Sequence, residues 1–194
     1  MSRIGLVAAL ALLLALLLAL AAAPARALEP FPPERLAEGG YALLLRHALA
    51  PGTGDPASFD LNDPTTQRRL SETGRAQARA LGAMLRAAGV QRARVFTSQW
   101  DRCRETAELL ALGPVADLPA LNSFFGRPAE RAMRLEALRD FLAAQPTDGP
   151  PIILVTHQVT VTGITGDFVR SGEGRALRLD GTRAPDVAGT LALP

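Results

Sequence analysis

The sequence contains no lysine, two histidines and one cysteine. Without lysine it cannot carry a P-loop, whose lysine reaches the phosphates of a bound nucleotide. The single thiol of Cys103 excludes an internal disulfide. A cysteine-based Cys-x5-Arg phosphate site is also excluded, because Leu109 occupies the arginine position. No Gly-x-Ser-x-Gly motif occurs, which excludes that form of serine hydrolase.

The same composition is unfavourable for a metal site. Two histidines supply at most two ligands, whereas zinc sites use three or four protein ligands. No closely spaced His-x-x-x-His or Cys-x-x-Cys pair occurs. We therefore predict neither a metal nor another cofactor. A metal-dependent hydrolase that uses His47 and His157 as ligands is the alternative.

The first residues have the pattern of an export signal. A basic start at Arg3 precedes an uncharged run of leucine and alanine over 4–23, and Ala25-Arg26-Ala27 offers a small-x-small cleavage site. We predict that residues 1–27 are a signal peptide and that residues 28–194 form one periplasmic or secreted domain. The run approaches the ~20 apolar residues that span a bilayer, so an uncleaved anchor is the alternative, and membrane contact is expected only then.

All 21 basic residues are arginine, and two of them lie in the predicted leader. The remaining 19 arginines face 19 acidic residues, which makes the formal charge of the mature domain zero. Proteins that bind nucleic acids depend on a basic face for affinity. We therefore predict no nucleic-acid partner. Oligomeric state is not predicted.

Apolar strand-like runs alternate with amphipathic segments along the mature domain. The predicted strands cover residues 41–46, 94–98, 115–118 and 152–156, with weaker ones near 176–179 and 190–193. The predicted helices cover 32–38, 72–88, 101–110 and 128–144, and another follows His157. This alternation predicts an α/β fold, a three-layer sandwich in which helices flank a mainly parallel sheet.

Both histidines lie where an apolar strand ends, and ligands of open α/β sheets bind at this edge. Arg46 directly precedes His47, and its guanidinium offers donors that match phosphate oxygens. An imidazole can form a covalent intermediate by attacking phosphorus. The attack requires a neutral ring, which a neighbouring cation favours. Arg46 and His47 are therefore candidate catalytic residues.

Two further strand ends supply candidates. Ser98 ends the strand 94–98, and Arg102 lies in the first turn of the next helix, where free N–H groups favour an anion. His157 follows the most apolar strand and precedes Gln158. We expect a protonated His157 to bind a phosphate oxygen and to stabilise developing charge. Ser98 and Gln158 are candidate substrate contacts.

The three segments occur in the order Arg46-His47, Ser98-x-x-x-Arg102-x-x-x-Thr106-Ala107 and Thr156-His157. This arrangement resembles the histidine phosphatase superfamily, the phosphoglycerate-mutase-like group, over residues 41–166. The resemblance implies that His47 is the nucleophile, that Arg46, Arg102 and His157 hold the phosphoryl group, and that no metal is needed.

The sequence departs from the family pattern at the proton donor. Leu121-Asn122-Ser123 resembles a segment in which the family carries glutamate, and serine cannot replace a carboxylic acid as general acid. Carboxylates of the long loop 50–69 are the substitutes. Among Asp55, Asp60 and Asp63 we favour Asp60 as a substrate contact and proton donor.

These observations predict an exported, metal-independent phosphomonoesterase. Its expected partner is a small phosphate ester in the periplasm or a phosphorylated glycan of the envelope. A pseudophosphatase that binds phosphate without turnover is an alternative, because Ser123 and Ala48 both depart from the family pattern.

Overall fold

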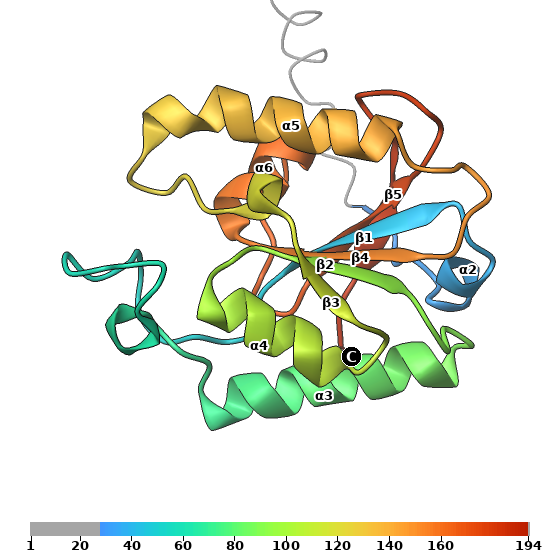
Figure 1. The fold of residues 1–194 in the computed structure, drawn as a ribbon. Coiled ribbons are helices and arrows are strands. Elements are labelled where there is room, and N and C mark those ends of the chain that lie inside the picture. Colours follow the sequence, from blue (N-terminus) through green and yellow to red (C-terminus); the bar gives the residue numbers. More distant parts are fainter. Residues whose placement is uncertain (1–27, 194) are drawn as a thin grey trace, which may run out of the picture.

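A computed structural model describes residues 28–193, which form a six-stranded sheet with helices on both faces (Figure 1). The strands are β1 (Tyr41–Arg46), β2 (Arg94–Thr97), β3 (Val115–Asp117), β4 (Ile152–Thr156), β5 (Gly174–Arg178) and β6 (Val187–Leu191). Their order is β3-β2-β4-β1-β5-β6. The first four are mutually parallel, while β5 runs antiparallel to both β1 and β6. The predicted α/β class is confirmed.

The helices are α2 (Glu34–Ala37), α3 (Glu72–Ala87), α4 (Asp101–Leu110), α5 (Arg131–Ala143) and α6 (Gln158–Thr165). Helices α3 and α4 cover one face of the sheet, and α5 and α6 cover the other (Figure 1). The helix predicted from Pro128 starts as a 3₁₀ turn, Pro128–Glu130, before α5 begins. Proline suits a first turn because it has no N–H to leave unpaired there.

The central strands are apolar on both faces, which explains their continuous hydrophobic runs. Along β1, Leu43 and Leu45 pack into the core beneath α3 and α4. Ala42 and Leu44 alternate with them and pack into the core on the side of α5 and α6. Strand β4 is buried at every position. The two layers of helices therefore hold β1 and β4 rigidly in the middle of the sheet.

The carboxyl ends of β2, β4 and β1 lie side by side at one edge of the sheet, because these strands are adjacent and parallel. Backbone hydrogen bonds continue past the strands: His47 N donates to the Thr156 oxygen, and Ser98 N to the Val155 oxygen, each at 2.9 Å. The residues that follow these three strands are thereby brought to one place, as the sequence predicted.

Differences from the predicted elements are confined to boundaries. Strands β5 and β6 begin two and three residues before the predicted segments. They lie at the antiparallel edge, and glycines such as Gly174 and Gly189 remove the hydrophobic pattern that marks a strand. No helix among residues 28–193 is long and apolar enough to span a membrane. The predicted signal peptide lies outside the described residues.

Helices α3 and α4 pack closely at Gly82, where an added Cβ would overlap the carbonyl oxygen of Leu110. We expect Gly82→Ala to lower the free energy of unfolding by about 2 kcal/mol, since overlap with fixed backbone outweighs the ~1 kcal/mol gained in helix propensity. Urea denaturation measures the change. Ala83→Ser, at the exposed neighbouring position, is the control. An unchanged or more stable Gly82→Ala protein would contradict the packing described.

Candidate active site

His47 follows β1 and is almost fully buried, with 4% of its surface exposed. Its Nδ1 lies 2.8 Å from the Ala48 carbonyl oxygen, so Nδ1 carries the proton and donates it. This tautomer leaves a lone pair on Nε2, which accepts from Arg102 Nε at 3.3 Å. Burial, and next the charge of Arg102, lower the pKa of His47 to about 3. The ring is therefore neutral, as a nucleophile must be.

His157 follows β4, and its ring centroid lies 5.6 Å from that of His47. Its Nε2 lies 2.8 Å from Ser98 Oγ, whose hydroxyl donates to Asn122 Oδ1 at 3.3 Å. Nε2 therefore donates to Ser98, and Nδ1 accepts from Arg102 Nη2 at 3.4 Å. Burial, and next the charge of Arg102, hold the pKa of His157 well below its ordinary value. The protonated ring expected from the sequence is thus corrected to a neutral one.

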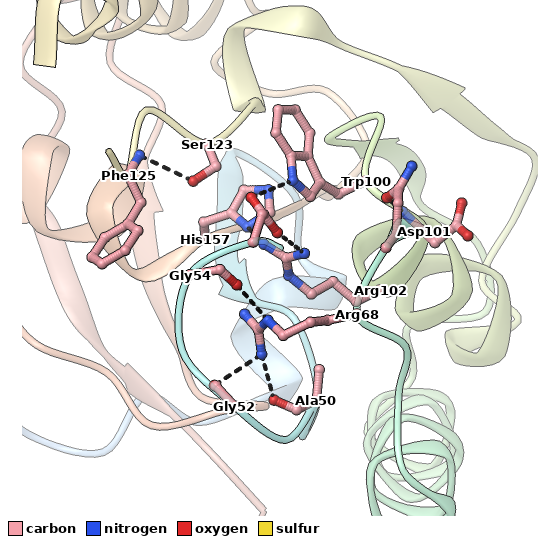
Figure 2. Close-up of polar contacts among 12 residues, drawn as sticks. Ala50, Gly52, Gly54, Arg68, Trp100, Asp101, Arg102, Ser123, Phe125 and His157 are labelled. Atoms are coloured by element: carbon pink, nitrogen blue, oxygen red, sulfur yellow. Dashed lines mark hydrogen bonds and ion pairs between the residues drawn. The ribbon is translucent and has the colours of Figure 1, made fainter. Parts of the chain in front are cut away.

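Arg102 lies in the first turn of α4 beside His157 (Figure 2), and its guanidinium contacts both imidazoles. Its third nitrogen, Nη1, donates to Asp55 Oδ1 at 2.8 Å. Asp55 Oδ2 in turn accepts from Trp100 Nε1 at 3.0 Å. Each nitrogen of this buried guanidinium therefore has an acceptor, which offsets the cost of removing its charge from water.

Arg46 reaches the same cavity from the end of β1. Its Nη1 donates to the Val169 carbonyl oxygen at 2.9 Å and to Gln158 Oε1 at 3.4 Å. Its Nε is buried without a hydrogen-bond partner in the described part of the chain. A buried donor without an acceptor is costly, so this N–H is available to an oxygen of a bound ligand. Gln158 orients the guanidinium and also lines the cavity.

Arg68 is a site residue that the sequence analysis did not single out. From the end of the loop 50–69 it donates to the carbonyl oxygens of Ala50, Gly52 and Gly54, at 2.8, 2.9 and 2.5 Å (Figure 2). The side chain also lines the cavity. Irregular loops carry no periodicity that shows which way a side chain points, so no pattern could reveal this role.

Together these residues enclose a cavity of about 330 Å³ at the edge of the sheet. Three guanidinium groups, those of Arg46, Arg68 and Arg102, line it together with both histidines. Asp55 is the one carboxylate among the described lining residues, so the wall carries an excess of positive charge. Such a cavity attracts an anion, and its size suits a small ligand.

The other predicted residues are placed in different ways. Ser98 is buried behind His157 and orients it, but does not line the cavity. Asp60 is exposed in an adjoining groove, where its Oδ1 accepts from Asn62 N at 2.8 Å. Asp63 accepts from Thr65 N at 2.9 Å and caps a 3₁₀ turn. Ser123 lines the cavity, and its Oγ accepts from Phe125 N at 3.2 Å. Asp55, rather than the favoured Asp60, therefore lies in the cavity.

No curated protein is significantly similar to this chain in sequence. Several solved structures share its fold. The protein histidine phosphatase SixA, solved with tungstate, aligns with a TM-score of 0.58 at 16% identity, over 78% of this chain and 96% of its own. A mycobacterial glucosyl-3-phosphoglycerate phosphatase, solved with VO₃, aligns with a TM-score of 0.55 at 17% identity, over 78% and 99%. A protein from Thermus thermophilus aligns with a TM-score of 0.53 at 21% identity, over 79% and 99%.

Residues 43–126 match the sequence model of the histidine phosphatase superfamily (branch 1). This match and the shared fold support assignment to the histidine phosphatase superfamily. The family assignment made from the sequence is thereby confirmed. The matched segment includes His47 and Arg102 but ends before His157. In the structure, the adjacency of β1 and β4 brings the second histidine to the first.

The lowered pKa values predict the titration of the two imidazoles. In ¹⁵N NMR spectra of the mature protein, we expect the His47 ring to stay neutral until the pH approaches 3. The unfolded chain takes up these protons near pH ~6.5, so the free energy of unfolding should fall as pH drops below that value. His47→Gln assigns the signals, since the chain has two histidines. A His47 midpoint near ~6.5 would contradict the described environment.

Proposed function

We propose that this protein is an exported, metal-independent phosphatase that hydrolyses phosphate monoesters through a phosphohistidine on His47. The observation that carries the proposal is the lone pair of His47 Nε2, 3.3 Å from Arg102, inside a cavity lined by three guanidinium groups. The cations offset the negative charge of a phosphate, and the neutral nitrogen supplies the electron pair for attack.

In the first step the phosphate group of the substrate enters the cavity, and its oxygens accept hydrogen bonds from the guanidinium groups. Arg102 and the unpartnered Nε of Arg46 donate to its oxygens. His47 Nε2 attacks phosphorus, and the bond from phosphorus to the leaving oxygen breaks. The proton on Nδ1 stays with the ring, where the Ala48 carbonyl oxygen stabilises the charge that develops.

In the second step water attacks the phosphohistidine, the P–N bond breaks and phosphate leaves. Before the substrate binds, His157 holds Arg102 in place through its Nδ1. A phosphate dianion beside His157 offsets the repulsion from Arg102, so the ring accepts a proton more readily in the complex than in the free protein. In that state His157 donates to a phosphate oxygen.

The substrate we infer is a small phosphate ester of the periplasm or a sugar phosphate of the cell envelope. The predicted leader supports export, and the cavity of about 330 Å³ suits a small molecule. Phe125 and Phe168, which are 52% and 70% exposed, line the cavity and offer flat apolar surfaces to a sugar ring. Contact with a membrane is expected only if the leader is retained.

Mature protein assayed on p-nitrophenyl phosphate tests the catalytic proposal. We expect His47→Ala to lose turnover by about 10³-fold or more, because the covalent intermediate cannot form. Radioactive phosphate from labelled substrate should appear on the wild-type protein as an acid-labile adduct, and be absent from the variant. Unchanged thermal unfolding of His47→Ala is the control for folding.

Two results would contradict this proposal. Loss of activity in a chelator, with recovery on adding Zn²⁺, would favour the metal-dependent hydrolase. Tight binding of inorganic phosphate without turnover of any ester would favour the pseudophosphatase.

Export is tested on the full chain expressed in a Gram-negative bacterium. We expect the protein in the periplasmic fraction with Leu28 as its first residue, because signal peptidase cleaves after Ala27 in the small-x-small site. Ala27→Arg is the matched variant, and should leave the leader attached. An intact amino terminus in the membrane fraction would favour the uncleaved anchor, and a cytoplasmic protein would overturn export.

A further inference from the structure

Asp55 is held at a defined point on the cavity wall. Its Oδ1 accepts from Arg102 at 2.8 Å and its Oδ2 from Trp100 at 3.0 Å, and its side chain is 12% exposed. Trp100 is itself immobilised, since its ring stacks on Phe59 with centroids 5.1 Å apart. The carboxylate therefore has two rigid partners, which is unusual for a residue in a long polar loop.

The loop that carries Asp55 is fastened to the same cavity. Arg68 donates hydrogen bonds to the carbonyl oxygens of Ala50, Pro51, Gly52 and Gly54. These bonds from one guanidinium fix the conformation of the turn that precedes Asp55. Gly52 and Gly54 have φ angles of +93° and +67°, a region that favours glycine. These contacts hold the Asp55 side chain at one position on the cavity wall.

That position lies on the far side of Arg102 from the nucleophile. The guanidinium contacts His47 through Nε and Asp55 through Nη1, so the two side chains face each other across it. Asp55 also lines the adjoining groove that contains Phe59 and Arg127. In-line displacement places the leaving oxygen opposite the attacking atom. Asp55 lines both the phosphate cavity and this groove, so a leaving group that extends from phosphorus into the groove would pass Asp55.

Binding of a phosphate ester changes the charge around Asp55. The cations that face it are Arg102 and Arg68, and both line the phosphate cavity. A phosphate dianion shares these cations and adds negative charge beside the carboxylate. Two anionic groups in contact favour protonation of one of them. A phosphate held by these two cations therefore lies beside the Asp55 carboxyl group.

We propose that Asp55 is the catalytic acid and base of this site, a role that rests on the phosphatase activity proposed above. Ser123, the residue at the family's glutamate position, accepts a hydrogen bond from Phe125 N and has no acidic proton to give. Asp55, which lies in a different loop, donates the proton to the leaving oxygen in place of that glutamate. It allows the protein to cleave esters of alcohols, whose oxygens leave poorly unless protonated.

The proton follows a closed cycle. When His47 Nε2 bonds to phosphorus, the P–O bond breaks and the leaving oxygen takes the proton of the Asp55 carboxyl group, which releases the alcohol. The Asp55 carboxylate then accepts a proton from water as the water oxygen bonds to phosphorus. The P–N bond breaks, phosphate leaves, and Asp55 is again protonated.

Asp55→Asn tests this role with two substrates, glycerol 1-phosphate and p-nitrophenyl phosphate. The value of kcat/KM reports the first irreversible step, which needs an acid for the alkyl ester and not for the aryl ester. We expect kcat/KM to fall by about 10²-fold or more on the alkyl ester and by less than about fivefold on the aryl ester. On the aryl ester kcat should also fall, with a burst of one equivalent of nitrophenol, because the second step lacks its base.

Asp63→Asn is the matched control, since Asp63 lies in the same loop outside the cavity and asparagine preserves its cap. It should behave as wild type on both esters. Equal losses of kcat/KM on the two esters in Asp55→Asn, or a gain in activity, would overturn the role of Asp55 and leave the phosphatase proposal standing. If wild-type protein cleaves neither ester and forms no phosphohistidine, the proposed function fails and the role of Asp55 fails with it.

Discussion

Arg102 is buried in the first turn of α4, and a cation at this depth needs an acceptor for each of its nitrogens. The acceptors are His47, His157 and Asp55, from the ends of two strands and from the long loop. Because imidazolium cannot accept a hydrogen bond at these nitrogens, the same contacts favour neutral histidines. Burial and this one charge thus keep His47 neutral, and the same charge fixes the position of the Asp55 carboxylate.

The arrangement also explains how a neutral domain can recognise an anion. Residues 28–194 contain equal numbers of arginine and acidic residues, yet three arginines and one aspartate line the cavity. Other arginines form ion pairs outside the cavity, as Arg104 does with Asp117. Binding depends on the local excess of positive charge, because exposed pairs more than a Debye length away are screened.

Much of the site could be predicted because its residues follow strands. Apolar runs mark β1 and β4, and the residue after each run is placed at the edge of the sheet by the parallel topology. That reasoning identified His47 and His157, and the first turn of a helix identified Arg102. It failed in the loop 50–69, where no repeating pattern constrains direction. No sequence pattern distinguishes the direction of Asp55 from that of Asp60, but hydrogen bonds from Arg68 fold the loop so that Asp55 faces inward.

The sequence alone therefore indicated the class of the fold, the family, and His47, His157, Arg46 and Arg102 as candidate site residues, since these depend on local hydrophobic patterns and short motifs. The tertiary structure alone decided the charge of His157 and the carboxylate that enters the cavity. Both depend on burial and on contacts between residues about 50 positions apart in the chain, as in the pairs Arg102–His157 and Arg102–Asp55. Desolvation and close contact between charges arise only when the chain is folded, and so local patterns do not reveal them.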